Sequence, residues 1–119
     1  MKVREIVDAL SLKVLAGAGV LEREVTGGYA SDMLSLVMAG ARPGNVWVTM
    51  QGHPNVAAVA SLLSLAAVVI TEGSPVDPVT LQRAEENGVP VLAAPADTFS
   101  TVAKLAAMGI RGASDRPEA

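Results

Sequence analysis

The spacing of apolar and polar positions divides the chain into short helices and short strands. Residues 2–10 repeat apolar side chains at the interval of one helical face, which predicts a helix. Residues 12–16 and 21–25 are expected to be strands, the second with glutamates alternating outward. The glycine-rich residues 17–19 between them predict a hairpin at one edge of a sheet.

From residue 25 onward, strand patterns alternate with helix patterns and the connections are short. The expected strands end at Val25 and then cover 46–50, 66–70 and 90–93, and the expected helices cover 33–39, 56–63, 78–87 and 98–108. Such alternation predicts right-handed crossovers and a parallel sheet. The fold class is therefore α/β, with a mostly parallel β-sheet flanked by helices in a single three-layer domain over residues 1–112. Residues 113–119 are polar and are expected to form a flexible tail.

The ends of these elements carry turn and cap signals. Gly27 and Gly28 predict a tight turn or a close backbone approach after the strand ending at Val25. Helix caps are expected at four polar residues, Ser31, Asn55, Asp77 and Asp97.

The apolar side chains of the expected helices and strands are assigned mainly to the core. Met33 and Met38 are expected to pack in the interior, and so are Phe99 and Val102 of the last helix. Trp47 is expected in the core or in an interface.

Composition narrows the classes of function. Half of the 119 residues are apolar, but there is only one residue each of Trp, Tyr and Phe, so the core is aliphatic. A net charge of −3 argues against nucleic acid and anionic membranes as partners. With no cysteine and one histidine, no disulfide, metal site or cofactor is expected. The longest apolar run is too short to span a bilayer, so we expect a cytoplasmic protein.

Candidate binding residues follow the expected strands, because ligands of open parallel sheets bind beyond the carboxyl ends of the strands. The candidate ligand-binding residues are Thr26, Gly27, Gly28, Tyr29, Ser31, Thr49, Gln51, His53, Asn55, Thr71, Glu72 and Gly73. The loops that follow the four expected strands, residues 26–32, 49–55, 71–77 and 94–98, contain no Lys or Arg. A neutral or singly charged ligand, or a nucleoside moiety, therefore fits better than a triphosphate.

Several of these residues have a second, structural interpretation. His53 is either an acid, base or recognition donor, or it is structural, as a solvated loop residue or part of a hydrogen-bonded cap, and we favour the structural interpretation. Glu72 and Asp77 form a possible carboxylate pair, although Asp77 is better explained as a helix cap. No catalytic triad or phosphate-binding P-loop is present, so no catalytic residue is assigned.

Three segments carry a resemblance to a known family. VTGGYASDMLSLVMAGA, GNVWVTMQGHPNVAAVASL and AAVVITEG resemble the DRTGG domain family over roughly residues 1–112, most closely its small stand-alone members. Related domains occur in some phosphotransacetylases and between the CBS domains of some inorganic pyrophosphatases, and the N-terminal domain of HPr kinase/phosphorylase is similar in fold. The Thr-Gly-Gly of the family signature is Thr71-Glu72-Gly73 here, and the Asp-Arg pair is absent.

The resemblance implies a regulatory, non-enzymatic module that is commonly dimeric. We therefore expect a small cytoplasmic domain that senses a metabolite or nucleotide-like ligand, as a homodimer or on a partner enzyme. The alternative is an interaction or assembly module for a partner enzyme, without a small-molecule site. The nearly all-apolar helix 56–63 and the region of Trp47 favour that alternative.

Overall fold

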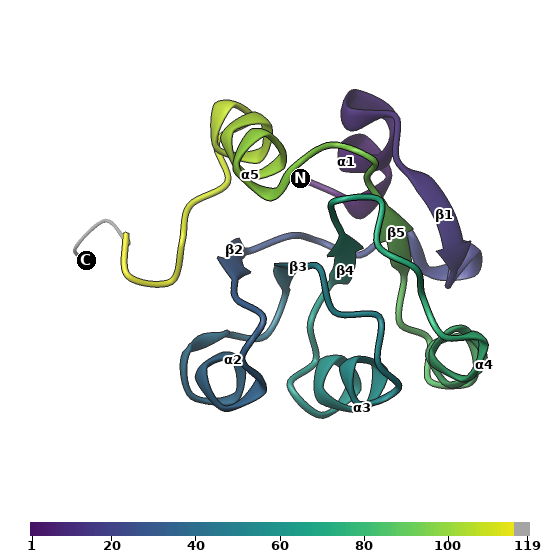
Figure 1. Ribbon diagram of the computed structural model, residues 1–119. Helices are drawn as coiled ribbons and strands as arrows, with labels where there is room; N and C mark the ends of the chain where they lie inside the picture. The colour runs from purple at the N-terminus through teal and green to yellow at the C-terminus, as the bar shows by residue number, and fades with distance from the viewer. Residues whose placement is uncertain (116–119) are drawn as a thin grey trace.

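The computed structural model describes residues 1–115 as a five-stranded sheet between two layers of helices (Figure 1). The strands are β1 (Lys13–Ala16), β2 (Gly27–Ala30), β3 (Asn45–Thr49), β4 (Ala67–Ile70) and β5 (Val91–Ala93). The helices are α1 (Val3–Leu10), α2 (Leu34–Gly40), α3 (Asn55–Leu62), α4 (Pro78–Glu86) and α5 (Thr98–Ala107), with a short 3₁₀ turn, η1 (Ala18–Val20). The predicted α/β fold is confirmed. Residues 116–119, part of the expected tail, lie outside the described residues.

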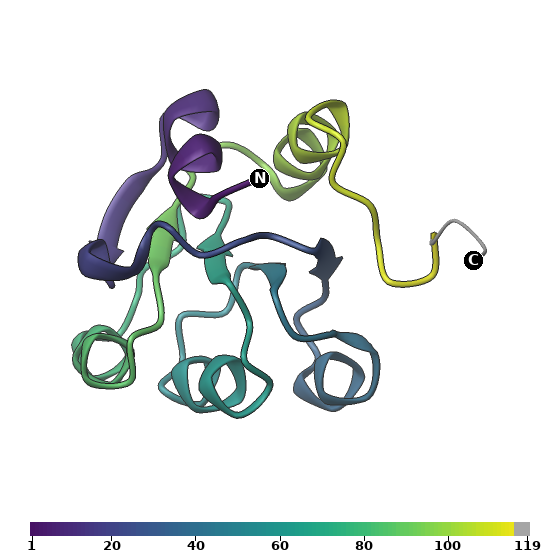
Figure 2. The ribbon, with the colours of Figure 1, turned by 180° about the vertical axis from the view of Figure 1, so that it is seen from behind.

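The strand order is β1-β5-β4-β3-β2, with β2 to β5 parallel and β1 antiparallel to β5. Each parallel strand lies beside the next one in the chain. Right-handed crossovers then place the connecting helices α2, α3 and α4 on one face of the sheet, whereas α1 and α5 cover the other (Figures 1 and 2).

Alternate side chains of the central strands supply the two halves of the core. Trp47 and Val68 point toward the α2–α4 layer, and Val46 and Val69 point toward the α1–α5 layer. All four are fully buried. The near-continuous apolar runs of β3 and β4 therefore reflect strands covered on both faces, as their sequence predicts.

The predicted hairpin of residues 12–16 with 21–25 is wrong. β1 pairs with β5 through Lys13↔Ala93 and Val14↔Leu92, and residues 21–25 form no strand. Residues 21–25 instead hydrogen-bond the N-terminal segment, where the Val3 amide donates to the Arg23 carbonyl at 3.0 Å. The outward glutamates that suggested a strand face are explained by this pairing.

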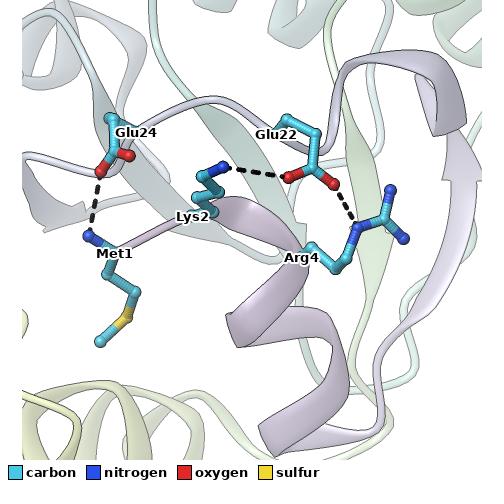
Figure 3. A network of polar contacts seen from close by, with 5 residues as sticks. All are labelled: Met1, Lys2, Arg4, Glu22 and Glu24. Carbon is cyan, nitrogen blue, oxygen red and sulfur yellow. Dashed lines mark hydrogen bonds and ion pairs between the residues drawn. The ribbon is translucent and has the colours of Figure 1, made fainter.

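Figure 3 shows the polar contacts of this N-terminal segment. Glu22 accepts from the Arg4 guanidinium and lies 3.4 Å from the Lys2 ammonium, while the N-terminal amine donates to Glu24 at 3.0 Å. The hydrogen bond from Arg4 lowers the pKa of the exposed Glu22 carboxyl. Charge alternation in residues 21–25 thus reflects ion pairing with the segment that leads into α1.

The predicted turn at Gly27 and Gly28 is also wrong, because both residues belong to β2. The C-terminal segment runs along the outer edge of β2, and the Gly28 amide donates to the Arg111 carbonyl at 2.9 Å. A Cβ on Gly27 would lie 2.8 Å from the Arg111 carbonyl oxygen. The glycine pair does allow a close backbone approach, and the approaching segment is the chain itself.

Several expected core assignments on the helices are wrong. Phe99 is 85% exposed and Val102 37% exposed, because α5 contacts the core mainly through Thr101 and Leu105. Met33 and Met38 are likewise exposed, at 58% and 49%. Trp47 is a core residue, fully buried, and its Nε1 donates to the Ser31 carbonyl at 2.9 Å.

Candidate functional site at the carboxyl edge of the sheet

The carboxyl ends of β2, β3, β4 and β5 lie at one edge of the sheet because these strands are parallel. The loops that leave this edge lead to α2, α3, α4 and α5. In open α/β sheets this is the edge at which ligands bind.

Asp32 ties the first two loops together. Its Oδ1 accepts from the Thr49 hydroxyl at 2.7 Å and from the Met50 amide at 2.9 Å. The Thr49 hydroxyl in turn accepts from the Gln51 amide at 3.1 Å. The Asp32 carboxylate thus fixes the turn that follows β3.

The starts of α2 and α3 are stabilised differently from the prediction. Ser31 Oγ accepts from the Met33 amide at 3.1 Å, but α2 begins at Leu34, one residue after Met33. Asn55 is the first residue of α3 rather than its cap, and its amide donates to His53 Nδ1 at 3.1 Å. His53 is exposed and its ring accepts the first amide of α3, in agreement with the favoured structural interpretation.

Gly52 allows the loop after β4 to cross the loop after β3. A Cβ at Gly52 would lie 2.2 Å from the Pro75 carbonyl oxygen, so only glycine fits. The Gly52 carbonyl accepts from the Thr80 hydroxyl at 2.7 Å and from the Asp77 amide at 3.1 Å. As predicted, Asp77 caps α4, its side chain accepting from the Val79 amide at 2.8 Å. These contacts hold the two loops as one unit.

The loops after β4 and β5 are joined by a second group of hydrogen bonds. The hydroxyls of Thr71 and Thr98 lie 2.7 Å apart, and the Thr98 amide donates to Glu72 Oε2 at 2.6 Å. The Glu72 amide donates to the Ala96 carbonyl at 2.9 Å. Glu72 has a φ of 63°, in the left-handed region that favours glycine.

Two carboxylates thus satisfy amides at the start of α5. Glu72 accepts from Thr98, and Asp97, the predicted cap, accepts from the Ser100 amide at 2.9 Å. The backbone and side-chain hydrogen bonds from Ser100 lower the pKa of Asp97. This helix terminus already holds negative charge from the chain itself, which its dipole favours.

The chain leaves the neighbouring strands β4 and β5 toward opposite faces of the sheet. The chain leaves β4 toward α4 on one face and leaves β5 toward α5 on the other (Figure 1). Such a switch point opens a crevice at the carboxyl edge. A hollow of about 340 Å³ lies there, lined by Ser11, Lys13, Ile70, Gly73, Ser74, Ala93, Ala94 and Pro95.

The structure brings most, but not all, of the candidate binding residues to this edge. Those at the carboxyl ends of β2, β3 and β4 or in the connections to the next helices are Ser31, Thr49, Gln51, His53, Asn55, Thr71, Glu72 and Gly73. Thr26 precedes β2 at the opposite edge, where its hydroxyl donates to the Pro43 carbonyl at 2.8 Å. Gly27, Gly28 and Tyr29 lie within β2.

Lys13 was not among the candidates. It lies at the start of β1, and antiparallel pairing with Ala93 brings it beside the carboxyl end of β5. The four loops lack basic residues, as the sequence showed, but the neighbouring strand supplies one. No local signal marks Lys13, because its position depends on a pairing between strands far apart in the chain.

Within residues 1–115, no three His, Asp or Glu side chains are grouped closely enough to hold a metal ion. In the same part of the chain, no helix combines the length and apolarity needed to cross a membrane.

A family model described as the DRTGG domain matches residues 5–108. This chain belongs to the DRTGG domain family. A search of the curated proteins found no significant match.

Among solved structures, the DRTGG chain is similar to the CBS and DRTGG domains of the regulatory region of Clostridium perfringens pyrophosphatase, complexed with the activator diadenosine tetraphosphate. The TM-score is 0.68 at 15% identity, with 86% of this chain and 44% of the other covered. The chain thus spans less than half of that structure. At this identity the likeness supports the fold, in agreement with the family.

Proposed function

We propose that this DRTGG domain is a regulatory, non-enzymatic module that binds a metabolite or nucleotide-like ligand at the carboxyl edge of its sheet. The observation that carries the proposal is the hollow at the switch point between β4 and β5. It lies where ligands of open α/β folds bind, and its volume is in the range of small-molecule sites.

Hydrogen bonds among the loops of the carboxyl edge support the same conclusion. Hydrogen bonds through Asp32, Gly52 and Glu72 connect consecutive loops, so the edge is largely preformed. The similar pyrophosphatase region, complexed with a dinucleotide activator, makes nucleotides a reasonable first class to test. By this proposal the domain works in the cytoplasm, as a homodimer or on a partner enzyme.

Thermal unfolding in the presence of nucleotides and small metabolites tests the proposal. A ligand that binds only the folded state at a concentration of about 100 Kd adds roughly 2.7 kcal/mol to stability, so Tm must rise. We expect Ser74→Ala, at the hollow, to reduce that rise, whereas Ser35→Ala, an exposed position on α2, serves as the control. A panel in which no compound raises Tm at millimolar concentration would contradict the proposal.

A second candidate function, an assembly module, is favoured by the outer surface of α2 and α3. Neither helix contains a charged residue, and Leu36 and Leu62 are 50% and 69% exposed. Trp47, which was expected in the core or in an interface, is buried and is not part of this surface.

Light scattering of the wild type and of the Leu36→Glu/Leu62→Glu variant tests this candidate. We expect the wild type to self-associate and the double variant to be monomeric. Val79→Glu, at an exposed apolar position on the charged helix α4, is the matched control and should leave the oligomeric state unchanged. A monomeric wild type would exclude the homodimeric form of this function.

A further inference from the structure

The hollow between β1, β4 and β5 combines an aliphatic wall with one cation. Its apolar wall is formed by Ile70, Ala93, Ala94 and Pro95, and Ser11, Gly73 and Ser74 also line it. None of the three aromatic residues of the chain lines it. The wall therefore suits a compact aliphatic group and offers no stacking surface for a base.

Lys13 is the basic side chain of this hollow. It is exposed at the start of β1, and the ion pairs found among residues 1–115 do not involve it. With no carboxylate partner among these described residues, the Lys13 ammonium can donate to a ligand anion. The other lysine nearby, Lys104, does not line this hollow but an adjoining one, which shares Ser11, Ala94 and Pro95 with it.

The remaining charges of this edge limit how negative a ligand can be. Glu72 directly precedes Gly73 of the hollow, and its carboxylate, like that of Asp97, occupies amides at the start of α5. The helix terminus that would otherwise attract a phosphate is thus neutralised by the chain. A polyphosphate would meet one lysine and two carboxylates, whereas a single negative charge is balanced by Lys13 alone.

We propose that this hollow binds a small aliphatic carboxylic acid. The ligand carboxylate accepts a hydrogen bond from the Lys13 ammonium, and its aliphatic body packs against Ile70, Ala93 and Pro95. This inference rests on the proposed function, of which it names the ligand class. A domain with this ligand class differs from one that recognises a nucleotide through its phosphates.

The test is a titration of the full chain, followed by amide chemical shifts in ¹H–¹⁵N spectra. The probes are isovalerate, its uncharged amide isovaleramide, inorganic phosphate, and ATP. We expect isovalerate to shift the amides of Ser11, Lys13, Gly73 and Ser74 saturably at millimolar concentration. Isovaleramide and inorganic phosphate should bind much more weakly, because the first lacks the charge and the second lacks the aliphatic body.

Three variants assign the binding energy. Lys13→Met should weaken isovalerate binding roughly tenfold, the effect of losing one charge-assisted hydrogen bond. Lys13→Arg should retain most of the affinity, and Lys104→Met is the matched control that should leave it unchanged. A lysine on an edge strand also discourages aggregation. Light scattering therefore checks that each variant has not aggregated, and the chemical-shift dispersion of the same spectra checks that it is folded.

The outcomes separate this inference from the proposed function. Isovalerate binding that is insensitive to Lys13→Met, or equal binding of isovaleramide, overturns the inference. Saturable binding of ATP at the carboxyl edge without isovalerate binding overturns the inference and leaves the proposed function standing. If no probe shifts these amides and no compound of the wider panel raises Tm, both fail.

Discussion

Glu72 shows how a single side chain can compensate for a backbone conformation that disfavours it. Its φ of 63° is in the left-handed region, where a non-glycine residue costs about 1–2 kcal/mol. The side chain offsets this cost by accepting the Thr98 amide at 2.6 Å. The resemblance of Thr71-Glu72-Gly73 to a Thr-Gly-Gly signature has a physical basis here, since glycine adopts this φ freely.

Substitutions at Glu72 should separate the two effects. Glu72→Ala keeps the left-handed backbone cost and loses the hydrogen bond, so it should be the least stable variant. Glu72→Gly loses the same hydrogen bond but relieves the backbone, and should be more stable than Glu72→Ala by about 1 kcal/mol. Chemical denaturation measures the free energy of unfolding of each variant. Equal stabilities would show that the left-handed conformation is not retained in the variants.

The β2 strand illustrates what the elements add beyond single residues. It is short and contains two glycines, yet it has a neighbour on each side, β3 and the segment around Gly112. Gly27 admits that segment, since a Cβ there would meet the Arg111 carbonyl oxygen. Glycine in this strand is thus explained by close packing of backbone rather than by a turn.

Gly27→Ala should lower the free energy of unfolding by about 1–3 kcal/mol, because overpacking against backbone cannot be relieved by a rotamer change. Gly28→Ala should cost less, since its Cβ would lie 3.2 Å from the Ile110 side chain and at an ordinary 3.6 Å from the Val46 carbonyl oxygen. Gly19→Ala is the control, with nothing within 4 Å of the added Cβ. Faster hydrogen exchange of the Gly28 amide in Gly27→Ala would report the displaced segment. No loss of stability in Gly27→Ala would contradict this account.

The elements with local signals were predicted well from the sequence. Asp77–Pro78, Asn87–Gly88 and Asp97 mark the ends of α4 and the start of α5 where the structure has them, because caps depend on neighbouring residues. The apolar runs of β3 and β4 likewise identify the centre of the sheet. These signals were enough for the fold class.

What the sequence did not reveal depends on contacts between distant segments. The partner of β1, the strand character of Gly27–Gly28 and the position of Lys13 all follow from pairing with residues far along the chain. Phe99 was assigned to the core because it is apolar, but which side of α5 faces the sheet is set by Thr101 and Leu105. The sequence therefore identified the edge of the sheet, but of the candidate binding residues only Gly73 lines the hollow, and Lys13 was not among them.

At the scale of the whole molecule, two exposed carboxylates with lowered pKa values, Glu22 and Asp97, contribute to stability against acid. The hydrogen bonds from Arg4 to Glu22 and from Ser100 to Asp97 lower these pKa values from the ordinary 4.5 and 3.8. The unfolded chain then binds more protons than the folded one just below those ordinary values. Both contributions are fully present above them and are lost as pH falls through the lowered folded pKa values.

Between about pH 5 and pH 3, the Tm of the Glu22→Gln/Asp97→Asn variant should therefore depend less on pH than the Tm of the wild type. A matched double variant, Glu5→Gln/Asp115→Asn, removes the same amount of charge from two other exposed carboxylates. Thermal unfolding from neutral pH to pH 3 compares the three proteins. If the two double variants behave alike, net charge rather than the named hydrogen bonds controls acid stability.

The position of β1 next to β5 has a consequence for how the chain is made. Strands β2 to β5 can be added in the order of synthesis, because each pairs with the one before it. β1 emerges from the ribosome before all of them but finds its neighbour only when Val91–Ala93 has been translated. Residues 1–16 of the nascent chain must therefore wait until β5 has been made before β1 can join the sheet.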